Sequence, residues 1–202
     1  MQKMAALVFP GFQTLDYFGP IEMLGGFRDE IEVVTVASTL DPVPSRHGQR
    51  IMPDRTLAES SDYKLLFVPG GDSALDAIKD EVLVHWVREV AGKADRVMAV
   101  CTGTILLGIT GVLDGKCATT NKLDFNDTVH LAPKVEWVKQ ARWVQDGKFF
   151  TSSGVSAGMD MALAAAADLF GRAAAEKMAE ECEYIWNDDP NHDPFASLAG
   201  LV

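Results

Sequence analysis

Residues 96–108 read RVMAVCTGTILLG, and this stretch predicts both a sheet and a reactive group. The apolar run 97–100 has the length and the β-branched residues of a buried strand, and residues 105–107 begin an apolar helix. Cys101 lies at the turn between them, where a sharp bend exposes a side chain at the carboxyl edge of a sheet, as in a nucleophile elbow. The start of the helix favours a thiolate at this position. The alternative is that Cys101 is a small buried apolar residue.

Apolar runs of strand length recur along the chain and are separated by segments with helical spacing. Strands are expected at residues 4–9, 31–37, 65–68, 97–100, 117–120 and 149–152, and a loop or edge hairpin at 41–53. Helices are expected after residue 20 up to residue 24 and at 80–93, 123–131, 159–170 and 173–185, with an edge strand or hairpin at 135–143 and a turn-rich segment without periodicity at 187–194. Strands alternating with helices predict an α/β fold, with a mainly parallel sheet covered on both faces. A single domain over residues 1–202 accounts for the length.

Composition and charge narrow the class of protein. The chain has 48% hydrophobic and 23% charged residues, which is ordinary for a globular protein, and its net charge of −11 argues against nucleic acid or an anionic membrane as partner. We expect no signal peptide and no transmembrane helix. Three scattered cysteines predict reduced thiols and a cytoplasmic location. The sequence contains no zinc-site, GxGxxG or P-loop pattern, so no metal or nucleotide cofactor is expected.

The predicted sheet brings reactive residues together, because ligands of a parallel sheet bind beyond the carboxyl ends of its strands. Asp16 follows the first strand and is a candidate general acid or base, since burial would raise its pKa; otherwise it caps a helix or lies in a loop. Gly70 and Gly71 can expose N–H groups toward a substrate, or form only a tight turn. The N–H of Thr102 is the expected second donor to a developing anion. None of the four histidines adjoins Cys101, so each is expected on the surface.

Several motifs in a fixed order identify a family. They are LVFPGF at 7–12, LD at 15–16, GP at 19–20, FVPGG at 67–71, VCTG at 100–103, GVLDGK at 111–116, ATT at 118–120 and TSSGVSAGMD at 151–160. In this order they resemble the DJ-1/PfpI superfamily of ThiJ-type proteins, which is related to class I glutamine amidotransferase domains, and especially its isocyanide hydratase branch. The resemblance implies a flavodoxin-like three-layer sandwich with a nucleophile elbow, a site without cofactor, a small-molecule substrate and a homodimer.

The same resemblance implies a reaction, the addition of water to an isocyanide to give an N-substituted formamide. The Cys101 thiolate would attack the terminal carbon to form a thioimidate, and Asp16 would supply the proton and then help to activate water. N–H groups of Gly71 and Thr102 would line the anionic side of the pocket, and the Thr102 hydroxyl would hydrogen-bond the thiolate or Asp16. Gly154 and Val155 would shape and cover the pocket, and Gly70 is expected to take part in binding the oxyanion or the substrate.

Two departures and two alternatives follow from the same resemblance. Protease-like members carry a histidine directly after the nucleophile, and Thr102 disfavours that activity. Relatives often carry a histidine after Ala-Thr-Thr, whereas Asn121 stands there and is expected to change the polarity of the pocket or its choice of substrate. One alternative is a glyoxalase III-like hydratase of methylglyoxal. The other is a non-enzymatic sensor or chaperone-like protein in which Cys101 is oxidised to a sulfinate.

Overall fold

A mainly parallel sheet forms the centre of the protein. The computed structural model describes residues 1–59 and 61–202. Across these residues, the strands of the central sheet are ordered β10-β11-β7-β6-β1-β2-β5, and all neighbours are parallel except β10 and β11. Their bounds are Gln2–Leu7 (β1), Ile31–Ala37 (β2), Arg55–Thr56 (β5), Leu65–Val68 (β6), Arg96–Val100 (β7), Trp143–Asp146 (β10) and Phe149–Ser152 (β11). The predicted α/β class and parallel sheet are confirmed.

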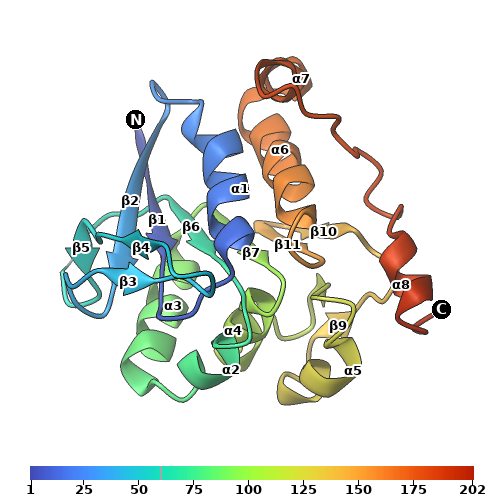
Figure 1. The fold of residues 1–202 in the computed structure, drawn as a ribbon, viewed down its shortest axis with the longest axis horizontal. Coiled ribbons are helices and arrows are strands. Elements are labelled where there is room, and N and C mark those ends of the chain that lie inside the picture. The colour runs from blue at the N-terminus through green and yellow to red at the C-terminus, as the bar shows by residue number, and fades with distance from the viewer. Residues whose placement is uncertain (60) are drawn as a thin grey trace.

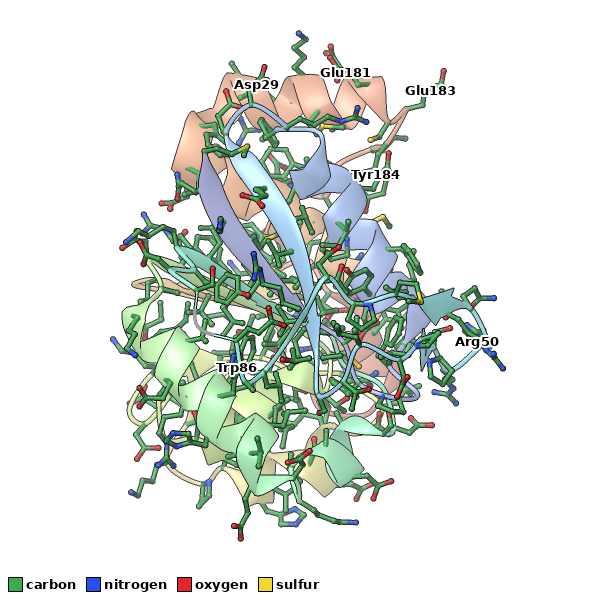
Figure 2. All side chains as sticks on the ribbon, turned by 90° about the vertical axis from the view of Figure 1, so that its left-hand side faces the viewer. Asp29, Arg50, Trp86, Glu181, Glu183 and Tyr184 are labelled. Atoms are coloured by element: carbon green, nitrogen blue, oxygen red, sulfur yellow. The ribbon has the colours of Figure 1, made fainter. Side chains whose placement is uncertain are left out.

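Helices cover both faces of this sheet and complete the three-layer sandwich (Figure 1). On one face α1 (Thr14–Gly25) packs against α6 (Ala157–Phe170), which also contacts α7 (Arg172–Glu181). The other face carries α3 (Glu81–Lys93), α4 (Gly103–Ile109) and the short α2 (Ala74–Ala77). Trp86, labelled in Figure 2, marks the buried side of α3, where its ring meets Tyr63 edge-on. None of the helices among the described residues is long and apolar enough to cross a membrane.

The smaller elements lie around this core. Two short two-stranded sheets pair β3 (Val43–Pro44) with β4 (Arg50–Ile51) and β8 (Cys117–Ala118) with β9 (Glu136–Trp137). The first is the hairpin expected within residues 41–53. Of the two alternatives for 135–143, the structure has the edge strand, β9, which pairs in parallel with β8, and not the hairpin. The helix expected at 123–131 is divided into α5 (Phe125–Thr128) and a 3-10 turn, Val129–Leu131. The chain ends with α8 (Pro194–Leu198), in a tail that was expected to be irregular.

Two helix boundaries differ from the sequence expectation for physical reasons. Helix α1 begins at Thr14 and contains Pro20, because its close packing against α6 outweighs the cost of a proline inside a helix. Helix α7 ends at Glu181 and not at residue 185, since Glu183 has a left-handed φ of 49° and the half-buried Tyr184, labelled in Figure 2, then donates its hydroxyl to Asp160. The first difference moves Asp16 from a loop into a helix.

The strand order places a crevice beside the predicted site. Chain connections run outward from β1 in both directions, toward β2 on one side and toward β6, β7 and β11 on the other. Such a reversal leaves a crevice between the loops at the carboxyl ends of the neighbouring strands. The segments that follow β1, β6 and β7 carry Asp16, Gly70-Gly71 and Cys101, so the topology brings the predicted residues to one edge.

Candidate functional site

Cys101 occupies a sharp turn between a strand and a helix. Strand β7 ends at Val100 and α4 begins at Gly103, and Cys101 between them has a left-handed φ of 58°. A non-glycine residue rarely adopts this conformation, so the neighbours must hold it there. The Cys101 N–H donates to the Ser152 carbonyl at 3.2 Å, and the Thr120 hydroxyl donates to the Cys101 carbonyl at 2.8 Å. The backbone therefore has the geometry of a nucleophile elbow.

The glycine loop after β6 lies directly against this turn. A Cβ atom on Gly70 would lie 2.7 Å from the Thr102 nitrogen and 2.8 Å from the Cys101 Cβ, so the contact requires a glycine. The N–H of Gly70 donates to Asp16 Oδ2 at 3.0 Å. The N–H of Gly71 donates to the Thr102 hydroxyl at 3.0 Å. Gly71 thus positions Thr102, which corrects the expectation that its N–H lines the anionic side of the pocket.

Asp16 reaches the same place from the first turn of α1. Its side chain is fully buried, and among the described residues its Oδ1 atom has no hydrogen-bond partner. Burial raises the pKa of Asp16 to about 7, and this rise is opposed by the Gly70 N–H and by an interaction with the Cys101 thiol. A buried carboxyl group that shares its environment with a thiol and titrates near neutrality can accept and return a proton.

Cys101 and Asp16 form a coupled pair. Burial raises the pKa of the Cys101 thiol to about 12, and the charge of Asp16 acts in the same direction. A resting thiolate beside an ionised Asp16 is therefore unfavourable, although the start of the helix was expected to favour one. When the pair loses its first proton, the remaining proton stays on the sulfur, because the pKa of the thiol is the higher of the two. The thiolate with a protonated Asp16 is then one proton transfer away from the resting form.

Thr102 interacts with the thiol through both its side chain and its backbone. Its hydroxyl donates to the Gly71 carbonyl at 2.8 Å and also interacts with the Cys101 thiol, whose pKa it lowers, which agrees with the expected contact to the thiolate. Its backbone N–H interacts with the Cys101 sulfur and lowers the pKa of the thiol. The backbone of Thr102 therefore faces the sulfur, as expected for a donor to a developing anion.

Asn121, which was expected to affect the polarity of the pocket or its choice of substrate, also contacts the thiol. Its Nδ2 atom donates to the Cys101 Sγ at 3.2 Å, from the loop between β8 and α5. Gly154 lies beside it, and a Cβ atom there would meet Nδ2 at 2.8 Å. The sequence did single out this position, because relatives often carry a histidine after Ala-Thr-Thr and this chain does not. That difference predicted a change in the polarity of the pocket, but not a contact with the sulfur.

An apolar pocket of about 320 Å³ adjoins Asn121 and Gly154. Val155, which was expected to cover the site, lines this pocket and has a left-handed φ of 50°. The opposite wall comes from Phe195 and Leu198 of α8, which Figure 1 shows beside α5 and β9. The sequence analysis missed this helix. Asp193 followed by Pro194 is a helix-start signal, and the Asp193 side chain does accept a hydrogen bond from the Phe195 N–H.

Histidines and metal ligands have no part in this arrangement. His47 contacts Thr14, and no histidine in the described part of the chain hydrogen-bonds the Cys101 sulfur. Within residues 1–59 and 61–202 no group of three histidine, cysteine or acidic side chains could hold a metal ion. The chemistry available at the site is therefore that of a thiol, a carboxyl group, an amide and backbone N–H groups.

Comparisons with known proteins agree with this architecture. The model of the DJ-1/PfpI family matches residues 2–168. The isonitrile hydratase of Pseudomonas putida is 36% identical over 180 residues, which cover 88% of this chain and 76% of that protein. A crystal structure of a ThiJ/PfpI family protein from Pseudomonas syringae has a TM-score of 0.84 at 31% identity and covers 95% of this chain and 78% of its own. DJ-1beta of Drosophila melanogaster shares the fold, with a TM-score of 0.80 at 21% identity, over 92% of this chain and 99% of its own. The chain belongs to the DJ-1/PfpI family.

Proposed function

We propose that this protein is an isocyanide hydratase that adds water to an isocyanide and releases an N-substituted formamide. The observation that carries the proposal is the buried pair of Cys101 and Asp16, in which a fully buried carboxyl group interacts with the thiol and has its pKa raised to about 7. An isocyanide carbon accepts both a nucleophile and a proton, so this pair supplies both components of the addition. The similarity to isonitrile hydratase supports the same reaction.

The first step transfers the thiol across the isocyanide carbon. Asp16 takes the proton from Cys101, and the sulfur attacks the terminal carbon of R–N≡C. The same carboxyl group returns that proton to the carbon, which gives the thioimidate R–N=CH–S–Cys101. Oδ1 of Asp16 suits this transfer because it is buried and, within the described residues, has no hydrogen-bond partner to compete for the proton.

The second step adds water and restores the thiol. Asp16 takes a proton from water as the oxygen attacks the thioimidate carbon, and the nitrogen receives that proton. The resulting R–NH–CH(OH)–S–Cys101 collapses to R–NH–CHO, while Asp16 carries the hydroxyl proton to the departing sulfur. The sum is one isocyanide and one water consumed and one formamide released, so the cycle needs no cofactor. The backbone N–H of Thr102 faces the sulfur while it carries negative charge.

The apolar pocket next to Asn121 suits the substituent of the isocyanide. Its wall contains Leu123, Val155, Phe195 and Leu198, and its volume of about 320 Å³ admits an aryl or alkyl group. We propose a small molecule with such a substituent as the substrate. The predicted single domain, the homodimer and the cytoplasmic location belong to the same proposal.

An assay with para-nitrophenyl isocyanide tests this function. We expect the wild-type protein to produce the formamide, and we expect Cys101→Ala and Asp16→Asn to lose that activity. Cys117→Ser is the matched control, because Cys117 lies on β8, outside the candidate site, and should leave the rate unchanged. A wild-type protein that is inactive here but consumes methylglyoxal would contradict the proposal and favour the glyoxalase III-like alternative.

The sensor alternative makes a different demand on the thiol. Oxidation to a sulfinate requires an accessible thiolate, whereas Cys101 is 4% exposed and burial raises its pKa. We therefore expect mass spectrometry after mild peroxide treatment to find little added oxygen on Cys101. Ready addition of two oxygens, together with inactivity toward both substrates, would favour the sensor instead.

A further inference from the structure

Hydrogen bonds hold both the oxygen and the nitrogen of the Asn121 side-chain amide. Its Oδ1 atom accepts hydrogen bonds from the N–H groups of Leu123 at 2.8 Å and Asp124 at 3.3 Å. An amide oxygen that accepts two backbone donors leaves the amide nitrogen to face the other way, where Nδ2 meets the Cys101 sulfur at 3.2 Å. The local turn of the loop therefore aims one N–H at the sulfur.

The loop that carries Asn121 is held on both sides of the residue. Before it, the Thr120 hydroxyl donates to the Cys101 carbonyl at 2.8 Å. After it, the buried Lys122 ammonium donates to the Thr119 hydroxyl and lies 3.8 Å from Asp193. Gly154 leaves room for the amide, since any Cβ atom there would meet Nδ2. Asn121 is thus a rigid donor and not a mobile polar side chain.

We propose that Asn121 is a catalytic residue whose amide N–H fixes the Cys101 sulfur and stabilises it while it carries negative charge. This inference rests on the proposed isocyanide reaction for its catalytic consequence, but the contact with sulfur can be tested without any substrate. The donor is needed twice, when the thiol loses its proton and when the sulfur leaves the adduct. Hydrogen bonds to charged acceptors are stronger than those between neutral groups.

The surroundings of the thiol make this contribution measurable. Asp16 of α1 is the charged group that faces Cys101 and raises its pKa, and the uncharged Asn121 and Thr102 lower it. Lys122 does not face the sulfur, because its ammonium group is directed to Thr119, Thr120 and Asp193. An amide does not titrate, so the donor remains in place at every pH at which the thiol reacts.

Two variants distinguish the effect of the hydrogen bond to sulfur from the effect of the turn that Asn121 Oδ1 stabilises. Asn121→Asp keeps an oxygen for the N–H groups of Leu123 and Asp124 and removes the donor to sulfur, but it adds a charge. Asn121→Ala removes the donor without adding a charge. The matched control is Asn126→Asp, which makes the same charge change on the exposed side of α5. Thermal unfolding of each variant checks that the fold is kept.

The readout is the pH dependence of Cys101 alkylation by iodoacetamide, followed by mass spectrometry of the Cys101 peptide so that Cys117 and Cys182 do not interfere. We expect both Asn121 variants to slow alkylation at any given pH by about tenfold or more, because a higher pKa of the thiol leaves less thiolate, and Asn126→Asp to leave the rate unchanged. With para-nitrophenyl isocyanide, kcat should fall about tenfold or more in both variants while KM changes little.

Two results would overturn the inference. If both Asn121 variants keep the wild-type alkylation profile, the amide only shapes the loop. If Asn121→Asp alone shifts the profile, the added charge explains the shift. A wild-type protein that does not turn over isocyanides, but whose thiol profile shifts in both variants, would contradict the proposed function and leave the role of Asn121 at the sulfur supported.

Discussion

Asp16 and Asp160 are both fully buried aspartates, and their surroundings differ completely. Asp160 accepts from Arg142 at 2.9 and 2.8 Å, from the Tyr184 hydroxyl at 2.9 Å and from the Asn187 N–H at 3.0 Å. Asp16 accepts from the Gly70 N–H, and its other oxygen has no partner within the described residues. A buried carboxylate with its charge and lone pairs satisfied holds a structure together, whereas one left unsatisfied has a perturbed pKa and can do chemistry.

The two residues also act on different parts of the molecule. Asp160 is in the first turn of α6 and connects that helix to β10 and to the chain beyond α7, which leads to α8. In the described part of the chain, the Asp16 carboxyl group interacts with the glycine loop and with the thiol. Replacement of Asp160 should therefore lower the stability of the fold, whereas replacement of Asp16 should lower activity.

The largest expected effect is on activity, in Asp16→Asn. The amide fills the same space and can still accept from the Gly70 N–H, but it cannot carry a proton. We expect kcat/KM for para-nitrophenyl isocyanide to fall by about 10² to 10⁴. Asp160→Asn is the matched control and should keep more than half of the wild-type rate per folded molecule. Equal losses in the two variants would remove the distinction between them.

The second effect is on stability, in Asp160→Asn. The substitution leaves the charge of Arg142, whose side chain is 9% exposed, without its buried partner. Breaking such a pair from one side costs about 3 to 5 kcal/mol of the free energy of unfolding. Urea denaturation of Asp160→Asn and Asp16→Asn measures this directly. A loss below 1 kcal/mol in Asp160→Asn would show that its hydrogen bonds contribute little to the fold.

The strand pattern predicted the fold and most of the site. The runs 31–37 and 65–68 coincide with β2 and β6, because buried parallel strands are apolar on both faces. The same pattern placed Asp16, Gly70 and Cys101 at one sheet edge. These are the positions that strand order and chain connection decide, and both leave strong signals in hydrophobic periodicity.

The rest of the site depends on contacts that periodicity does not record. The direction of the Gly71 N–H depends on where the Thr102 hydroxyl lies, across two loops. The contact of Asn121 with sulfur depends on a local turn in which the Asn121 side-chain oxygen accepts a hydrogen bond from the Leu123 N–H. The resting charge of Cys101 was wrongly predicted because the start of the helix is one influence among several, and burial next to Asp16 outweighs it.

A third effect appears in the pH dependence of stability. Burial raises the pKa of Asp16 from 3.8 to about 7, so the folded protein binds a proton that the unfolded chain releases between these values. The contribution of this proton on Asp16 to the free energy of unfolding is fully present below about pH 4 and is lost as the pH rises through 7. Asp16→Asn should therefore be more stable than wild type at pH 8, by at most about 4 kcal/mol for a shift from 3.8 to about 7.

The same comparison contains its own control, because Asp16→Asn and wild type should become equally stable near pH 4. Chemical denaturation at pH 4, 6 and 8 measures the difference. A gap that is constant across this range would mean that Asp16 is not the group that titrates, and that the asparagine stabilises the fold for another reason.

The smallest expected effect tests whether the chain segment that Asp160 holds contributes to substrate binding. The tail that it anchors leads to α8, where Leu198 lines the apolar pocket and is 79% exposed. Leu198→Ala should change the free energy of unfolding by less than about 0.5 kcal/mol, as expected for an exposed side chain. If the pocket holds the substituent of the substrate, KM for para-nitrophenyl isocyanide should rise about threefold to tenfold, since a lost apolar contact weakens binding by about 1 kcal/mol. If KM rises and kcat is unchanged, α8 contributes to substrate binding and Asp16 to the chemical step. A fall in kcat at constant KM would instead place α8 at the reacting atoms and the substituent of the substrate elsewhere.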